Sequence, residues 1–203
     1  MTGPLLVLIG FLAGAIPFGY LAGRSMQGID LRNVGSGGTG ATNVLRTLGK
    51  KASATVLVLD FLKGLLPVLL ARWLGLDDRW VAAVAVATVV GHCWSPFIGF
   101  KGGKGVATGG GAAIALFPPA LLVVPVILLI IWRSRLVSLG SLIGAGLAVV
   151  LAAAFAATGQ LPWAHALGIS AIAAIIVFRH RENIDRLRSG SERKLGQKVQ
   201  VSA

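Results

Sequence analysis

Charged residues, acidic ones above all, are scarce in this chain of 203 residues. Only 13% of the residues are charged, 7 are Asp or Glu, and 55% are hydrophobic. This composition excludes an ordinary soluble domain of this size, because such a domain needs far more charge on its surface. It is typical of a polytopic membrane protein.

Cysteine is also scarce, and clustered metal-binding residues are missing. The single cysteine, Cys93, excludes an internal disulfide, and its apolar surroundings predict a small buried side chain. Acidic, histidine and cysteine residues form no cluster of ligands, so we expect no metal and no other cofactor. The net charge of +12 does not indicate a nucleic-acid partner, because the cations are scattered between apolar runs.

Apolar runs fill most of the chain. The first covers residues 4–23, enough to cross a bilayer, and no basic segment precedes it, so we expect an uncleaved span. Pro17 and Gly19 predict a kink or an early end of this helix. Further runs lie at 52–74, 81–100, 106–132, 136–158 and 163–178.

The Lys and Arg residues decide whether 106–132 is one span or two, because Pro118 and Pro119 cut it into short halves. With two spans, seven helices result, and the 19 cations lie on one side except for Lys63, Arg72 and Arg79. The positive-inside rule favours this arrangement. We therefore predict an all-α polytopic membrane protein of about seven transmembrane helices, with the amino terminus outside and the carboxyl terminus cytoplasmic.

Residues 35–46 differ from the apolar runs, because glycines, hydroxyl residues, an amide and an arginine fall within twelve positions. Glycine permits positive φ angles, so successive amides can surround an anion, and a helix that begins near Ala41 would add its own amides. Arg46 would bind a phosphate or a carboxylate. The expected binding residues are Ser36, Gly37, Gly38, Thr39, Gly40, Thr42, Asn43 and Arg46.

Two further polar segments fall on the same side of the predicted topology. One carries further expected binding residues, Lys101, Gly102, Gly103 and Lys104. The other follows the last span, and if it continues as a helix, His180 and Asn183 face the same way. A glycine-rich anion site beside basic residues and a histidine indicates chemistry on phosphorylated compounds at the cytoplasmic interface.

Three motifs in this order resemble a known family. They are Gly35-Ser-Gly-Gly-Thr-Gly-Ala-Thr-Asn43, Gly91-His92 followed by Phe100-Lys-Gly-Gly-Lys-Gly-Val-Ala-Thr108, and His180-Arg-Glu-Asn-Ile184. Together they closely resemble the acyl-phosphate-dependent glycerol-3-phosphate acyltransferases, the PlsY family of bacterial membranes. The resemblance runs nearly from end to end. The family usually has asparagine at the position of Gly38 and a small aliphatic residue at that of Thr39.

The resemblance implies a multi-pass enzyme of the bacterial inner membrane whose active site faces the cytoplasm. It would move an acyl chain, whose tail lies between spans and is open to lipid, from acyl phosphate to glycerol 3-phosphate, giving lysophosphatidic acid and inorganic phosphate. The expected catalytic residues are His180, Asn183, Ser36, Lys104 and Arg46. His180 would take the proton of the acceptor hydroxyl, and an oxygen of the acyl phosphate is the alternative base.

A transporter or channel for a phosphorylated metabolite is the alternative function. It would explain the spans, the glycines and the basic residues. Against it, the polar segments gather on one face, whereas carriers place their site near the midplane and often show repeated halves. The sequence contains no internal repeat.

Other polar residues are expected to be structural. Asp60 and Lys63 are three residues apart and predict an internal ion pair, and His92 predicts a packing role. Residues 1–188 form a single predicted transmembrane catalytic domain, and 189–203 a basic cytoplasmic tail. We expect removal of the tail beyond Arg188 to leave most of the activity.

Overall fold

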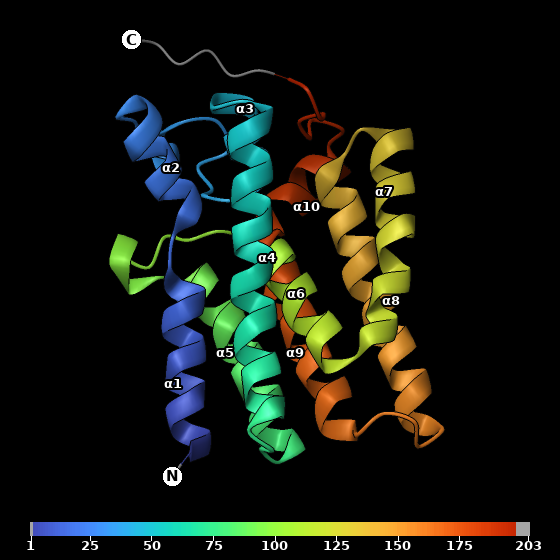
Figure 1. Ribbon diagram of the computed structural model, residues 1–203. Helices are drawn as coiled ribbons and strands as arrows, with labels where there is room; N and C mark the ends of the chain where they lie inside the picture. Colours follow the sequence, from blue (N-terminus) through green and yellow to red (C-terminus); the bar gives the residue numbers. More distant parts are fainter. Residues whose placement is uncertain (1, 198–203) are drawn as a thin grey trace.

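The chain is described by a computed structural model over residues 2–197, and within this range it is helical (Figure 1). The all-α prediction is confirmed. The helices are α1 (Thr2–Ala15), α2 (Phe18–Gln27), α3 (Ala41–Thr47), α4 (Lys50–Trp73), α5 (Asp78–Cys93), α6 (Val106–Leu116), α7 (Val123–Ser134), α8 (Val137–Ala157), α9 (Trp163–Arg179) and α10 (Arg181–Arg188). Short 3-10 turns are η1 (Leu31–Asn33), η2 (Pro96–Ile98) and η3 (Pro118–Leu122).

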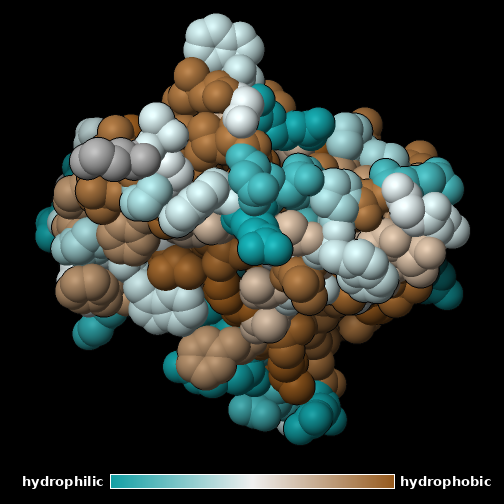
Figure 2. Space-filling view, turned by 90° about the horizontal axis from the view of Figure 1, so that it is seen from below, coloured by the Kyte–Doolittle hydropathy of each residue, from teal (hydrophilic) through white to brown (hydrophobic). Residues whose placement is uncertain are grey.

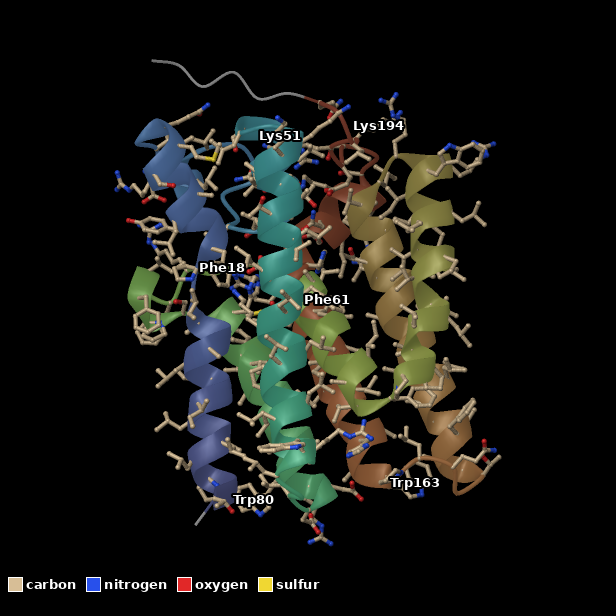
Figure 3. The ribbon with its side chains drawn as sticks, viewed as in Figure 1. Phe18, Lys51, Phe61, Trp80, Trp163 and Lys194 are labelled. Atoms are coloured by element: carbon tan, nitrogen blue, oxygen red, sulfur yellow. The ribbon has the colours of Figure 1, made fainter. Side chains whose placement is uncertain are left out.

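The long helices run up and down one bundle whose two ends differ. Lys51 and Lys194 lie at one end, here called the basic end, and Trp80 and Trp163 lie at the other, the tryptophan end (Figure 3). Figure 2 looks onto the tryptophan end, where hydrophilic and hydrophobic residues are mixed. Tryptophan at the end of an apolar helix is typical of a membrane interface.

Several helices are long and apolar enough to cross a membrane. Within the described residues there are four such segments, Thr2–Gln27, α4, Asp78–Ile98 and α8, and a fifth if α9 and α10 are counted together across their 60° bend. Leucines on their outer faces, such as Leu57 and Leu66, are more than half exposed. Such side chains are suited to contact with lipid.

Both predicted proline breaks are present. α1 ends at Ala15 and α2 begins at Phe18, so the helix is interrupted at Pro17, which has no amide hydrogen to donate. The run 106–132 is divided by η3, which turns the chain so that α6 and α7 run in opposite directions (Figure 1). α6 is about 16 Å long, about half the thickness of the hydrocarbon core.

Glycines allow two pairs of helices to pack backbone against backbone. A Cβ atom at Gly14 of α1 would lie 2.0 Å from a backbone oxygen of α5, and one at Gly91 of α5 would lie 2.1 Å from a backbone oxygen of α1. The same relation joins Gly64 of α4 to α6, at 2.0 Å. Small residues at such contacts bring helices close together in lipid, and here they fix the positions of α5 and α6, which carry the loop between them.

The predicted ion pair of α4 is confirmed. Lys63 Nζ lies 2.7 Å from Asp60 Oδ1, and both side chains are almost fully buried. Lys63 Nζ also donates to the Ile16 carbonyl oxygen at 2.7 Å, where α1 and α2 meet. Nδ1 of the buried His92 lies 3.7 Å from the same Asp60 oxygen. These groups lie near Phe18, about midway between the two ends of the bundle (Figure 3).

Candidate active site

The glycine loop, residues 35–40, is held in shape by one asparagine. The buried Asn43 donates from Nδ2 to three backbone carbonyl oxygens at 2.9–3.1 Å, and its Oδ1 accepts from the Ser36 amide at 3.0 Å. All its polar atoms are engaged with the backbone. Asn43 was expected to bind substrate, and this stays a prediction; what the structure shows is that its side chain holds the shape of the loop.

The backbone of the glycine loop has the predicted positive φ angles at some of its glycines and not at others. Gly35 and Gly37 have positive φ angles of 67° and 69°. Gly40 has an ordinary φ of −79° and precedes α3, which begins at Ala41 as predicted. The loop therefore needs glycine for its conformation at two positions and not at every one.

The second loop, residues 101–105, lies between α5 and α6 and is here called the lysine loop. Gly102 and Gly103 donate their amides to the carbonyl oxygens of Cys93 and His92, both at 3.2 Å. Their own carbonyl oxygens accept from the Arg179 guanidinium at 3.0 Å. These glycines were expected to bind substrate, and this stays a prediction; in the structure their amides and carbonyl oxygens have protein partners that shape the loop.

The two lysines of the lysine loop are in different surroundings. Lys101 is exposed, whereas Lys104 is half-buried and its ammonium donates to Asn183 Oδ1. Burial, followed by the nearby charge of Arg186, lowers the pKa of Lys104 to about 8. Lys104 is therefore a cation at neutral pH that has little water around it, which strengthens its interaction with an anion.

His180 lies at the junction of α9 and α10 and is 3% exposed. Its Nδ1 is 2.8 Å from the Ile176 carbonyl oxygen, which can only accept, so the proton is on Nδ1 and the lone pair is on Nε2. Burial lowers the pKa of His180 to about 4, so the ring is neutral at pH 7. Asn183 is buried on the same side, while Arg181 and Glu182 are exposed, as the spacing predicted.

Arg46 reaches the site from α3. Its Nη2 donates to the Arg193 carbonyl oxygen at 3.3 Å. Among the residues that the structure describes, its buried Nε has no hydrogen-bond partner. Burial, and then the charge of Arg193, lowers the pKa of Arg46, although a guanidinium stays protonated in proteins. A buried N–H without a partner is suited to donate to an anionic ligand.

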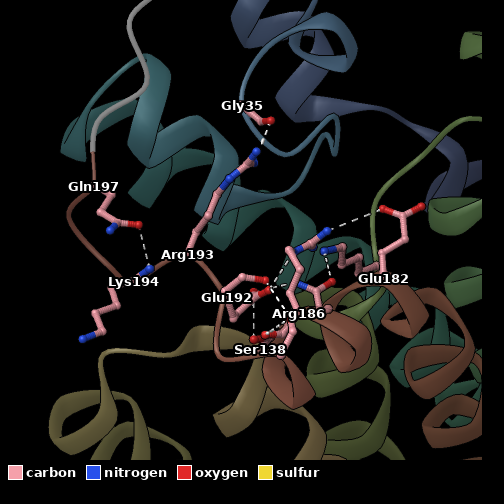
Figure 4. Close-up of polar contacts among 12 residues, drawn as sticks. Gly35, Ser138, Glu182, Arg186, Glu192, Arg193, Lys194 and Gln197 are labelled. Atoms are coloured by element: carbon pink, nitrogen blue, oxygen red, sulfur yellow. Dashed lines mark hydrogen bonds and ion pairs between the residues drawn. The ribbon is translucent and has the colours of Figure 1, made fainter.

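Sequence reasoning missed the residues that surround Asn183. Glu192, beyond α10, accepts hydrogen bonds from Ser138 and Asn183, and Arg193 donates to the Gly35 carbonyl oxygen at 2.7 Å (Figure 4). One signal was available in the sequence, because Glu192 is the only acidic residue after Asp185. Nothing in the sequence pointed to Ser138.

The predicted residues thus fall into three groups. Lys104, His180 and Asn183 meet where α6, α9 and α10 come together, and Arg46 is close enough to affect the charge state of Lys104. These four residues are here called the charged cluster. Lys101, Gly102 and Gly103 lie in the lysine loop. The remaining residues lie in or next to the glycine loop, which Arg193 joins to the charged cluster. They are Ser36, Gly37, Gly38, Thr39, Gly40, Thr42 and Asn43.

A narrow apolar groove of about 80 Å³ begins beside this cluster. It is lined by α6, α7, α8 and α9. Its lining includes Val106, two residues after Lys104, and Ile176, whose carbonyl oxygen is bound to His180. Gly109 and Gly110 contribute no side chains to its wall. The groove is therefore lined by neighbours of Lys104 and His180 and not by these two residues themselves.

Comparisons with known proteins give a consistent result. A family model described as "Glycerol-3-phosphate acyltransferase" matches residues 4–190. The chain is 46% identical over 201 residues to "Glycerol-3-phosphate acyltransferase 1" of Deinococcus radiodurans, covering 98% of both chains. It is 47% identical to the glycerol-3-phosphate acyltransferase of Rubrobacter xylanophilus, covering 97% of this chain and 96% of that one.

Two solved structures resemble the fold closely. One is the glycerol 3-phosphate form of PlsY, an integral membrane glycerol 3-phosphate acyltransferase, with a TM-score of 0.88 and 41% identity, covering 97% of this chain and 96% of that one. The other is its lysophosphatidic acid form, with a TM-score of 0.86 and 39% identity, covering 97% of both chains.

Proposed function

The chain belongs to the glycerol-3-phosphate acyltransferase family, and on this basis we propose that it transfers an acyl group from an acyl phosphate to glycerol 3-phosphate. It is a membrane acyltransferase of lipid synthesis. The products would be lysophosphatidic acid and inorganic phosphate. Because the family consists of acyltransferases, the transporter alternative is no longer favoured.

Two cations from separate elements, Arg46 and Lys104, carry the proposal. The reaction brings together two phosphate groups, one on the donor and one on the acceptor, and each needs a positive partner. Arg46 has a buried N–H without a partner among the described residues, and Lys104 is a half-buried ammonium. The Ser36 hydroxyl and the glycine loop would hold the acyl phosphate, since neutralising its charge makes phosphate a better leaving group.

The proposed step forms one bond and breaks another. A hydroxyl oxygen of glycerol 3-phosphate attacks the acyl carbonyl carbon, an ester C–O bond forms, and the C–O bond to phosphate breaks. His180 is placed to take the hydroxyl proton, because its Nε2 carries a lone pair and the ring is neutral at pH 7, but its pKa of about 4 makes it a weak base. The alternative base is an oxygen of the acyl phosphate, and His180 would then only donate or accept a hydrogen bond.

The apolar groove supports a place for the acyl chain. It is lined by small and branched residues from α6 to α9, apolar except for Ser141, and Val106 and Ile176 in its lining are neighbours of Lys104 and His180. A groove of this size would take only the part of the acyl chain nearest to its carbonyl carbon, which would place that carbon near His180. We propose further that the basic end of the bundle faces the cytoplasm of a bacterial cell, as the positive-inside rule favours, with seven passages through the inner membrane.

The first experiment is a phosphate-release assay on the purified protein in lipid. Palmitoyl phosphate and glycerol 3-phosphate are supplied with EDTA present, and palmitoyl-coenzyme A is tested as a parallel donor. We expect phosphate release that depends on glycerol 3-phosphate and equals the lysophosphatidic acid formed. Activity with the thioester alone would contradict the proposed donor.

The base is tested with His180→Gln, and His165→Gln is the matched control. His165 is also buried, but it pairs with Asp78 on α5 near the tryptophan end. A general base contributes about 10²–10⁴-fold, so we expect His180→Gln to lower kcat by that factor and His165→Gln to leave it nearly unchanged. A loss below about tenfold for His180→Gln would favour the acyl phosphate oxygen as base.

A further inference from the structure

The segment after α10, residues 189–197, is here called the C-terminal strap. The sequence predicts a basic tail whose removal leaves most of the activity. In the structure the strap turns back over the charged cluster and lies between the glycine loop and α8 (Figure 4). Its one acidic residue, Glu192, points into this cluster.

Glu192 is firmly held. Its side chain is only 7% exposed. Oε1 accepts hydrogen bonds from Ser138 Oγ at 2.9 Å and from Asn183 Nδ2 at 2.6 Å, and Oε2 accepts from Arg186 Nε at 2.9 Å. Burial alone would raise the pKa of Glu192, but the hydrogen bonds from Asn183, Arg186 and Ser138 outweigh it and lower the pKa. Glu192 is therefore an ionised acceptor with three donors.

This carboxylate determines how the Asn183 amide is oriented. A carboxylate can only accept hydrogen bonds and an ammonium can only donate them. The Asn183 amide must therefore turn its NH₂ group to Glu192 and its oxygen to Lys104. Without Glu192 the amide could rotate, and Lys104 would lose a fixed acceptor that holds its ammonium in the site.

The strap also reaches the other half of the site. Arg193 donates to the Gly35 carbonyl oxygen, and the Arg193 carbonyl oxygen accepts from Arg46 at 3.3 Å. Leu195 donates its amide to the Arg135 carbonyl oxygen at 2.7 Å, in the connection between α7 and α8. On the other side of Glu192, Ser191 donates its amide to the Arg186 carbonyl oxygen at 2.9 Å. Residues before and after Glu192 are thus anchored, so the carboxylate is placed by the fold and not by a free tail.

We propose that Glu192 is a positioning residue for the acceptor: through the Asn183 amide it fixes Lys104 where the phosphate of glycerol 3-phosphate binds. This inference rests on the proposed function. Glu192 contacts the lysine-loop side of the site and not the glycine loop. Its loss should therefore weaken binding of the acceptor and leave binding of the acyl phosphate unchanged.

The test is Glu192→Gln, with Glu182→Gln as the matched control. Glu182 is on α10, its side chain is 71% exposed, and it lies 4.0 Å from the same Arg186 (Figure 4). Glutamine has one oxygen where glutamate has two, so at position 192 at least one of the three donors loses its acceptor. We expect the KM for glycerol 3-phosphate to rise at least about tenfold, with the KM for palmitoyl phosphate unchanged. Glu182→Gln should leave both constants at their wild-type values.

A double-mutant cycle separates positioning from a structural effect. If Glu192 acts through the amide, then Glu192→Gln should cost little once Asn183→Ala has removed that amide, so the two effects on KM should be far from additive. Additive effects would contradict the proposal. A fall in the KM for glycerol 3-phosphate in Glu192→Gln would also overturn it, because the carboxylate would then be competing with the substrate phosphate.

A milder variant keeps the proposal testable if Glu192→Gln does not fold. Ser138→Ala removes one of the three donors, and we expect a smaller, severalfold rise in the KM for glycerol 3-phosphate alone. An unchanged KM in Ser138→Ala together with unfolded Glu192→Gln would reject the proposal. A wild-type protein without activity would instead reject the proposed function, so the two failures are distinguishable.

Discussion

At the scale of single residues, the site depends on two titratable groups, His180 and Lys104, on which burial has different consequences. Burial lowers the pKa of His180 to about 4 and that of Lys104 to about 8. Between these values the imidazole is neutral and the ammonium is charged. These are the protonation states that a proton acceptor and a phosphate-binding cation require. The free protein therefore has both groups ready near neutral pH.

The pH dependence of the reaction should show this on its alkaline side. Lys104 is protonated below its pKa of about 8 and loses its charge as the pH rises above it. We expect kcat/KM for glycerol 3-phosphate to fall above about pH 8. The measurement is a pH profile of kcat/KM and of kcat. The fall in kcat should lie at higher pH, because bound phosphate stabilises the charged ammonium.

The variant Lys104→Arg tests the assignment. A guanidinium keeps its charge over the accessible range, so this variant should lose the alkaline fall even if its rate at pH 7 is lower. Lys101→Arg is the control, since Lys101 is exposed. An alkaline fall that persists in Lys104→Arg would assign the titration to another group.

At the scale of elements, the glycine loop combines a required conformation with an open surface. Gly35 has a φ of 67°, and a Cβ atom there would lie 2.2 Å from Asn43 Oδ1. A Cβ atom at Gly38 would meet only Ser36 Oγ, at 3.8 Å. The first position therefore cannot accept a side chain without disturbing the asparagine that holds the loop, whereas the second can.

Two substitutions test this difference. We expect Gly35→Ala to lower kcat/KM for palmitoyl phosphate at least about tenfold, because a positive φ costs an L-residue about 1–2 kcal/mol even before the clash. Gly38→Asn, which introduces the residue of the resembled family, should stay within about twofold of wild type. A wild-type rate in Gly35→Ala would show that the loop shape is not needed.

Much of the fold was predictable because its causes are local. Pro17 and Pro118 break helices since they lack an amide hydrogen, and Asp60 and Lys63 pair because residues three apart share a helix face. The hydrogen bonds from Arg179 to the carbonyl oxygens of Gly102 and Gly103 were not predictable, because Arg179 is distant from them in the chain. The contact of Glu192 with Ser138 joins residues 54 positions apart, which no local pattern encodes.

At the scale of the whole molecule, the bundle has a basic end and a tryptophan end, and the charged cluster connects to the basic end through the strap. Lys51 is exposed at the basic end, and Gln160 is exposed in the loop that precedes Trp163 at the other. Cys93 is fully buried, so the native chain gives little background for thiol labelling. These three facts allow the proposed orientation to be measured.

We expect a membrane-impermeant maleimide added to intact bacterial cells to label Gln160→Cys and not Lys51→Cys. In inverted vesicles the pattern should reverse, because the basic end is proposed to face the cytoplasm. The native chain, with Cys93 alone, serves as the control for both preparations. Labelling of Lys51→Cys in intact cells would mean that the orientation is the opposite one.

The buried pair in α4 also bears on how this helix enters the bilayer during synthesis. A single ionised side chain makes insertion of a helix costly. Lys63 and Asp60 lie 2.7 Å apart on one helix, so α4 brings its own counter-ion and does not depend on a neighbour for neutralisation. When α1 then docks, the ammonium meets the Ile16 carbonyl oxygen. Because this contact forms at only one position of α1 along the axis of α4, it fixes how far the two helices are shifted relative to each other along that axis.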